Sequence, residues 1–175
     1  AGPENPLTLR NVLGDMTVTA NFAPAEYLVT FLAEAHGTVN GMAEVTFTVV
    51  HAGSAPAVAA VGDEGYSFIG WSGDHAGLEN PLTLTGVVDD MTVTATFAIN
   101  EYRVAFETDG TPGASLSGEL LQTVTHGGDC TPVAVDALPG FEFLGWTGDH
   151  VGAENPLTIA NVTSDLTVVA AFGRR

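Results

Sequence analysis

A sequence repeat with a period of 75 residues constrains this chain more than any other feature. The block Gly-Trp-Ser-Gly-Asp at residues 70–74 returns as Gly-Trp-Thr-Gly-Asp at residues 145–149. A second block, Glu-Asn-Pro-Leu-Thr, occurs at residues 4–8, 79–83 and 154–158, again 75 positions apart. A fixed period of this length indicates structurally similar units packed in series, whatever the total length alone would suggest.

The copies divide the chain into three parts. Residues 26–100 and 101–175 each hold a full copy, and residues 1–25 hold only the second half of one. Residues 98–101 alone connect the last expected strand of the first full copy with the first expected strand of the next. We expect such a short connection to leave adjacent copies little freedom. Because residue 1 lies inside a copy, we also expect the chain to be a segment of a longer protein.

Alternation of apolar and polar residues predicts strands throughout the repeat. The strands expected in the first full copy cover residues 27–32, 45–49, 66–71, 82–85 and 91–97, and the second copy repeats them. The partial copy predicts strands at residues 7–12 and 16–22 by the same pattern. No substantial run shows a helical period, so we expect a β-rich fold with little helix and many glycine-marked turns.

Charge and composition exclude several classes of partner. Twenty-one acidic and four basic residues give a formal net charge of −17 at pH 7. Such a surface repels phosphate groups, which excludes nucleic acid as a partner and disfavours anionic membranes. No apolar stretch approaches the roughly 18 residues of a membrane span, so we expect no membrane insertion. Cys130 is the single cysteine and has Ala55 one period upstream, so we expect it to fill a small space in the core.

The two tryptophans, Trp71 and Trp146, lie at the end of the aromatic strand of each full copy. A large aromatic side chain there most simply anchors the core of a small domain, and we favour this interpretation. The alternative is an exposed indole that binds a glycan by stacking on a sugar ring.

Side-chain oxygens gather in the turn that follows each tryptophan. The residues are Asp74, Glu79 and Asn80 in the first full copy, and Asp149, Glu154 and Asn155 in the second. Oxygen ligands of this kind suit a hard cation, so a calcium site is one hypothesis. The spacing matches no EF-hand, and Asp and Asn commonly hydrogen bond to nearby backbone in turns, so we favour a turn-stabilising role without a cofactor.

No catalytic arrangement stands out. The five histidines lack a neighbouring His or Cys at zinc-site spacing. The serines near a His and an Asp do not lie on a strained strand-to-helix turn of the kind that exposes a nucleophile. We therefore expect that the protein is not an enzyme.

Apolar residues at several strand positions indicate contact with other copies. They are Leu28 and Leu32 in the first full copy, Val169 and Ala171 in the second, and Met16 and Val18 in the partial copy. We expect them to contact neighbouring repeats of this chain or, alternatively, other chains. The partial copy would then offer an unpaired strand, and its addition to a second chain would build a filament.

The motifs together resemble the bacterial internalin B-repeat class, and most closely its divergent branch, which is related to the Listeria–Bacteroides repeats. The resemblance covers nearly the whole chain. It rests on Tyr-x-Val-x-Phe at residues 27–31, on the aromatic-Gly-Trp block at 64–74, on Asn-Pro-Leu-Thr-Leu at 80–84 and on the closing strand at 91–97. It implies small β-grasp-like repeats with antiparallel or mixed sheets, strung in tandem in secreted or cell-wall-attached proteins and without catalytic residues.

From the residues and this resemblance we expect a structural protein of the bacterial cell surface or extracellular space. It would act as a rigid stalk or spacer, or as the subunit of a self-assembling filament. The alternative is an adhesin-type module that binds a protein or glycan of a host or neighbouring cell through its loops.

Overall fold

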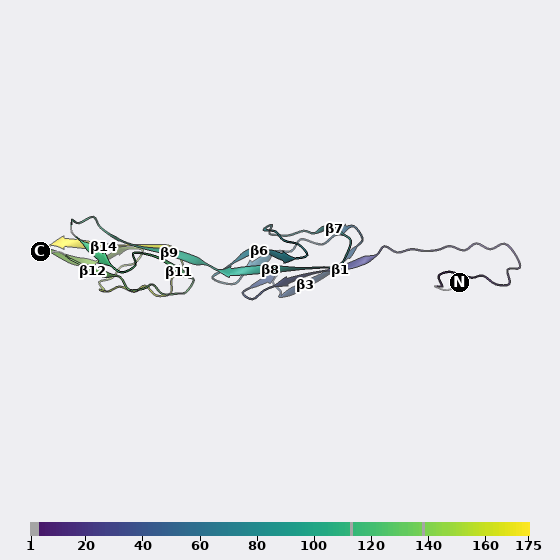
Figure 1. The fold of residues 1–175 in the computed structure, drawn as a ribbon, viewed down its shortest axis with the longest axis horizontal. Coiled ribbons are helices and arrows are strands. Elements are labelled where there is room, and N and C mark those ends of the chain that lie inside the picture. The colour runs from purple at the N-terminus through teal and green to yellow at the C-terminus, as the bar shows by residue number, and fades with distance from the viewer. Residues whose placement is uncertain (1–3, 113, 138) are drawn as a thin grey trace.

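The computed structural model describes residues 4–112, 114–137 and 139–175, so residues 1–3 of the expected partial copy lie outside it. The described residues form 14 strands and no helix, and therefore contain no helix that could cross a membrane. Two β-rich units follow each other along one line, and the N-terminal segment extends away from the first unit (Figure 1). The expectation of a β-rich tandem fold with mixed sheets is confirmed.

The first unit is built on a four-stranded mixed sheet. Its strands are β1 (Glu26–Ala33), β2 (Gly37–Val39), β3 (Glu44–Val50), β4 (Gly53–Ser54), β5 (Ala60–Gly62), β6 (Tyr66–Gly73), β7 (Thr85–Val87) and β8 (Met91–Ile99). The main sheet has the order β3-β1-β8-β6, in which β1 and β8 are parallel and the two outer pairs are antiparallel. Two short ladders, β2 with β5 and β4 with β7, complete the unit.

The second unit repeats this plan. Its strands are β9 (Glu101–Thr108), β10 (Ser115–Ser117), β11 (Leu121–Thr125), β12 (Ala134–Asp136), β13 (Phe141–Gly148) and β14 (Leu166–Arg174). The main sheet has the order β11-β9-β14-β13, again with parallel central strands. A short β10–β12 ladder takes the place of β2–β5, and a single bridge between Gly128 and Val162 takes the place of β4–β7.

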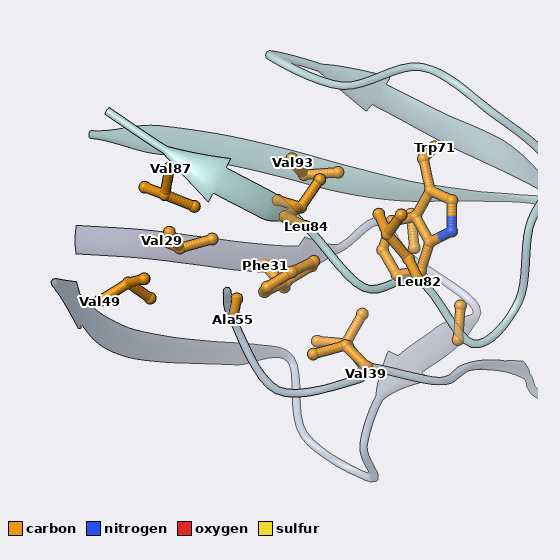
Figure 2. Packing of buried hydrophobic residues seen from close by; sticks show 13 residues of the cluster. Val29, Phe31, Val39, Val49, Ala55, Trp71, Leu82, Leu84, Val87 and Val93 are labelled. Atoms are coloured by element: carbon orange, nitrogen blue, oxygen red, sulfur yellow. The ribbon is translucent and has the colours of Figure 1, made fainter. Parts of the chain in front are cut away.

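Each unit has its own core on one face of its main sheet. In the first unit, Val29 and Phe31 of β1 and Val93 of β8 are completely buried (Figure 2). Burial alternates along these strands because successive side chains point to opposite faces. The segments at residues 55–60 and 82–87 cover this face with small and branched side chains. Each Val or Leu buried in this way contributes roughly 1.5–3 kcal/mol to stability.

Residues 4–25 form no strand, so the strands expected at residues 7–12 and 16–22 are not found. Met16 and Val18, which we expected at an interface, are largely exposed. The physical reason is that a strand must pair its backbone N–H and C=O groups with neighbouring strands. In the full copies the neighbours of the equivalent strand β8 are β1 and β6, and the partial copy has no counterpart of either.

Candidate functional site

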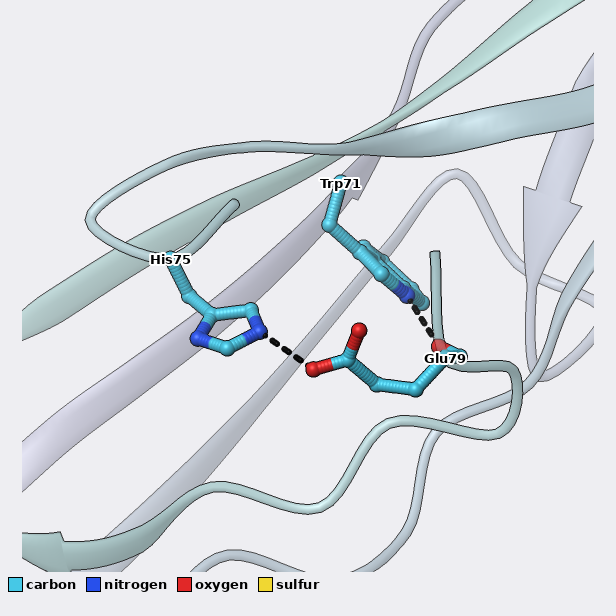
Figure 3. Close-up of polar contacts among 3 residues, drawn as sticks. All are labelled: Trp71, His75 and Glu79. Atoms are coloured by element: carbon cyan, nitrogen blue, oxygen red, sulfur yellow. Dashed lines mark hydrogen bonds and ion pairs between the residues drawn. The ribbon is translucent and has the colours of Figure 1, made fainter. Parts of the chain in front are cut away.

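Both tryptophans are core residues of their units. Trp71 on β6 is 4% exposed and Trp146 on β13 is 1% exposed. The ring of Trp71 packs edge-on against Phe31, with 5.8 Å between ring centroids. Its indole N–H donates a hydrogen bond to the carbonyl oxygen of Glu79 at 2.8 Å (Figure 3), and Trp146 makes the same bond to Glu154. The indoles therefore tie the core to the turn that follows, and neither presents a face to solvent for stacking on a sugar.

The asparagine of each Glu-Asn-Pro block bonds to backbone that lies 20 residues upstream. The Asn80 side chain donates to the carbonyl oxygen of Ala60 at 2.7 Å and accepts from the Ala60 N–H at 2.9 Å. Asn155 makes the equivalent pair of bonds with Val135. A side-chain amide can pair in this way because it carries one acceptor and two donors. The asparagine thus acts as one additional strand residue beside β5 or β12.

The acidic residues of the same turns have other partners. Asp74 accepts a hydrogen bond from the Thr92 N–H at 2.7 Å, and Asp149 accepts one from the Thr167 N–H at 2.8 Å. Glu79 lies 2.8 Å from the His75 ring nitrogen Nε2 (Figure 3). The pKa of the Glu79 carboxyl is lowered, first by its own backbone N–H and then by the His75 side chain.

These contacts bear on the calcium hypothesis. Asp74, Glu79 and Asn80 each bond to a different partner. In the second unit Asp149 and Asn155 repeat these bonds, whereas Glu154 lies 3.8 Å from Nε2 of His150 and that buried nitrogen has no hydrogen-bond partner among the described residues. Within residues 4–112, 114–137 and 139–175, no cluster of three His, Cys, Asp or Glu side chains is arranged to hold a metal ion. The geometry supports the turn-stabilising role, and a calcium site here stays a hypothesis that chelation can test.

The two units meet at Asn100, the single residue between β8 and β9. The Asn100 N–H donates to the carbonyl oxygen of Gly65 in the first unit at 2.8 Å. The Asn100 carbonyl oxygen accepts from the His126 N–H of the second unit at 2.8 Å. Its side-chain oxygen also accepts from the Ser67 hydroxyl at 2.6 Å. One residue is therefore bonded both to the turn before β6 and to the loop after β11.

The imidazole ring of His126 packs against Gly65 across the junction. Gly65 has a φ of +78°, and a Cβ atom at this position would overlap the ring. The Tyr102 hydroxyl lies 3.3 Å from Nδ1 of the same ring. The short connection was expected from the sequence, but neither Gly65 nor Asn100 was predicted to be important. The available signals were the glycine that recurs at residue 140 and the histidine that recurs at residues 51 and 126.

The two outer ends of the pair of units repeat parts of this junction. At the N-terminal end, the His51 N–H donates to the carbonyl oxygen of Ala25 at 2.7 Å, as His126 does to Asn100. At the C-terminal end, the Arg175 N–H donates to Gly140 at 3.0 Å, as Asn100 does to Gly65. An ion pair between Glu142 and Arg175 at 3.9 Å stands where the first unit has the Ser67–Asn100 bond.

The remaining residues singled out by the sequence lie away from these bonds. Leu28 is 51% exposed, whereas Leu32, Val169 and Ala171 are half-buried. None of these four residues forms a hydrogen bond across the junction. Their contact with another chain stays a prediction.

Cys130 is buried. Its burial, and to a smaller extent the charge of Asp129, raises the pKa of its thiol. The thiol is therefore protonated at neutral pH and poorly reactive.

A family model described as the divergent InlB B-repeat domain matches residues 27–101 and, a second time, residues 104–175. The chain belongs to this family. InlB B-repeats are generally non-catalytic modules, and tandem B-repeats are typical of surface proteins. A protein of Evansella cellulosilytica named "Putative membrane protein" is 35% identical over 92 residues. The match covers 52% of this chain and 13% of that protein, so the B-repeat chain corresponds to a small part of it.

Proposed function

We propose that this B-repeat chain is a rigid spacer of the bacterial cell surface, without catalytic activity. Its two repeats would hold their far ends at a fixed separation and orientation. The observation that carries the proposal is the junction at Asn100, where one residue bonds to both units and the His126 ring fills the space beside Gly65. Association with the cell surface is supported by the typical setting of tandem B-repeats and by the name of the Evansella protein.

The junction bonds favour one relative orientation over bent forms. A hydrogen bond typically contributes about 0.5–1.5 kcal/mol net, and exposed bonds lie at the low end of that range. A bend after Asn100 breaks the bond from His126, and a bend before it breaks the bonds to Gly65 and Ser67. One or two bonds at about 0.5 kcal/mol each favour the docked arrangement by about 0.5–1 kcal/mol, or roughly two- to fivefold. The packing of His126 against Gly65 adds to this preference, because bending would expose the ring.

A distance measurement between the two units tests the proposal. Cys130 is first replaced by alanine, the residue that already occupies the equivalent buried position 55. Spin labels are then attached through Thr48→Cys on β3 and Thr123→Cys on β11, which are equivalent exposed positions. We expect one narrow distribution of label distances by pulsed electron resonance. A broad or bimodal distribution would show a flexible tether and would refute the spacer function.

A binding function is the second candidate, and exposed apolar side chains in the turns after the tryptophans favour it. Leu78 is 77% exposed and Val151 is 79% exposed. The test is whether the chain binds a surface protein or glycan. Loss of this binding in the variants Leu78→Ser and Val151→Ser, with the melting temperature of the parent kept, would support a binding function. Replacing Trp71 or Trp146 is a poor test, because both side chains are buried and their loss would disturb the fold.

A further inference from the structure

Strand β3, an outer strand of the first repeat's main sheet, has a free edge. Within the residues that the structure describes, β3 pairs with β1 alone, and the antiparallel register continues without a bulge from one end of β3 to the other. The unpaired N–H and C=O groups along an outer strand form a template for one more strand. This edge of β3 is therefore open to pairing with another backbone.

The register identifies the backbone groups that point outward from this edge. Residues of an antiparallel strand bond alternately to one side and to the other. The Ala33 N–H donates to the carbonyl oxygen of Ala43 at 2.8 Å, so Ala33 and every second residue before it in β1 face β3. Their partners in β3 are Val45, Phe47 and Val49. The N–H and C=O groups of Thr46 and Thr48 therefore point outward, and no hydrogen bond within the described residues uses these backbone groups.

The side chains on the inner face of this edge are apolar and only partly covered. Val45 and Phe47 pack against the core of the first repeat, yet both keep part of their surface exposed to solvent. The Phe47 ring meets Phe31 edge-on, with 6.2 Å between ring centroids. A strand placed beside β3 would cover the remaining apolar surface of Val45 and Phe47, and this burial favours binding.

The other outer strands of the two main sheets are less open. β6 contains a bulge, and its Trp71 N–H already donates to Gly77 in the turn that follows. β13 repeats both features. β11 is shorter than β3, and Gln122 takes the position of Phe47 there and bonds through its side chain to the backbone of Thr131. Bulges and short strands are common means of protecting a sheet edge, and β3 has neither.

Charge selects the kind of strand that can bind at the free edge of β3. Residues 26–100 contain nine acidic residues and no Lys or Arg. Glu44 begins β3, and Glu26 of β1 is paired with Val50 at the other end of β3, so an exposed carboxylate lies near each end of the edge. A second copy of the chain would bring more negative charge to this edge and would be repelled. A basic segment would be attracted.

We propose that the free edge of β3 binds an extended, basic peptide segment of a partner protein. The segment would lie antiparallel to β3 and pair with the outward N–H and C=O groups of Thr46 and Thr48. Its residues on the inner face would be apolar and would cover Val45 and Phe47. Its Lys or Arg residues would lie near the carboxylate at each end of the edge. This binding goes beyond the spacer function, and neither function depends on the other.

The test combines the full chain with a synthetic peptide of sequence Lys-Val-Thr-Val-Thr-Val-Lys. We expect one peptide to bind per chain by calorimetry. Amide hydrogen exchange should slow at Thr46 and Thr48, whose N–H groups point outward, and should not change at Val45 and Phe47, which already bond to β1. Replacing both Lys residues of the peptide with Glu should abolish binding.

Two methylated peptides test the strand pairing and leave the protein unchanged. The backbone nitrogens of the two Thr residues of the bound peptide face β3, and those of its Val residues face away. N-methylation of both Thr residues should therefore weaken binding at least tenfold. N-methylation of two Val residues should leave binding within threefold of that of the parent peptide.

Two pairs of protein variants locate the binding edge. Thr48→Pro removes an outward N–H and should weaken binding at least tenfold, whereas Thr123→Pro, at the equivalent position of β11, should bind within threefold of the parent. Glu44→Gln should weaken binding about two- to fivefold and reduce its dependence on salt. Glu119→Gln, at the equivalent position of the second repeat, should leave both unchanged.

Several results would overturn the proposal. One is absence of binding by the Lys peptide, and another is equal binding by the Glu peptide. A third is an equal loss of binding for the two methylated peptides, which would show that no strand pairing occurs. A fourth is protection of Thr46 and Thr48 in the chain alone that increases with concentration, which would show pairing between copies of the chain. None of these measurements depends on the distance between the two repeats.

Discussion

Replacing Gly65 with alanine should change the angle between the two repeats, and the same replacement at Gly140 should not. Both glycines have a positive φ, +78° and +90°, and both accept a hydrogen bond from the residue that ends their unit. They differ in the atoms that a Cβ at each position would meet. The His126 ring packs against Gly65, whereas no described atom lies within 4 Å of a Cβ placed on Gly140.

The backbone cost of the two variants is similar, so their difference isolates the contact with His126. A non-glycine residue in the left-handed region costs about 1–2 kcal/mol, and we expect each variant to lose about this much unfolding free energy from its own repeat. Gly65→Ala adds an overlap with the ring, which must retreat by roughly 1 Å to reach the usual carbon–carbon separation of about 3.5 Å. The contact between Nδ1 of His126 and the Tyr102 hydroxyl restrains rotation of the ring, so we expect the His126 backbone, whose N–H is bonded to Asn100, to move with it.

The assay is the spin-label distance between Thr48→Cys and Thr123→Cys in the Cys130→Ala background, with calorimetry of the same proteins. Gly65→Ala should shift or broaden the distance distribution, and Gly140→Ala should reproduce that of the parent. Calorimetry should show the shared loss of stability in both. An unchanged distribution for Gly65→Ala, or equal changes in the two variants, would refute the view that the contact between His126 and Gly65 sets the angle.

Three further predictions follow from the contacts within each repeat. Asn80→Ala should lower the unfolding free energy by about 2 kcal/mol, because it removes two hydrogen bonds worth about 1 kcal/mol each. Asn5→Ala, at the exposed counterpart, should leave the unfolding free energy unchanged. Urea denaturation measures both. The pKa of the Asp109 carboxyl is lowered from its usual value of 3.8, first by the hydrogen bond from the Phe172 N–H. The ionised carboxylate therefore stabilises the second repeat at a pH above 3.8, and this stabilisation is lost as the pH falls through the lower pKa of the folded state. The melting temperature of Asp109→Asn should therefore lie below that of the parent at neutral pH and approach it in acid. Finally, excess calcium and EDTA should give equal melting temperatures, because the side chains of Asp74, Glu79 and Asn80 already bond to other groups of the chain. A rise in melting temperature with calcium would instead support the calcium hypothesis.

The main sheets could be predicted from the sequence because alternation of side chains is a local signal. The strands expected at residues 27–32, 45–49 and 66–71 correspond to β1, β3 and β6. No strand was expected in residues 51–65, yet this segment contains the short strands β4 and β5. Two or three residues are too few to show a period, and these strands exist because the chain brings partners to them from far along the sequence. The strand expected at residues 82–85 shows the same effect, since it is reduced to one bridge at Leu82 followed by β7.

The polar contacts could not be read from spacing for a related reason. The sequence placed Asp74, Glu79 and Asn80 in one turn, which is the arrangement that suggested a cation. In the structure the Asn80 side chain points to Ala60 and that of Asp74 to Thr92, so the partners are set by tertiary position. The junction shows the same limit, because the meeting of Gly65 with His126 depends on how two complete units stack. Recurrence of a residue marked the positions, but only the fold shows what each one contacts.

The partial copy separates the contribution of local sequence from that of partner strands. Residues 16–22 read Met-Thr-Val-Thr-Ala-Asn-Phe, and residues 91–97 read Met-Thr-Val-Thr-Ala-Thr-Phe, so the two differ at one position. The second stretch forms most of β8, bonded to a strand on each side, and the first forms no strand. Strand propensity is therefore the same in both places, and the neighbours β1 and β6 make the difference.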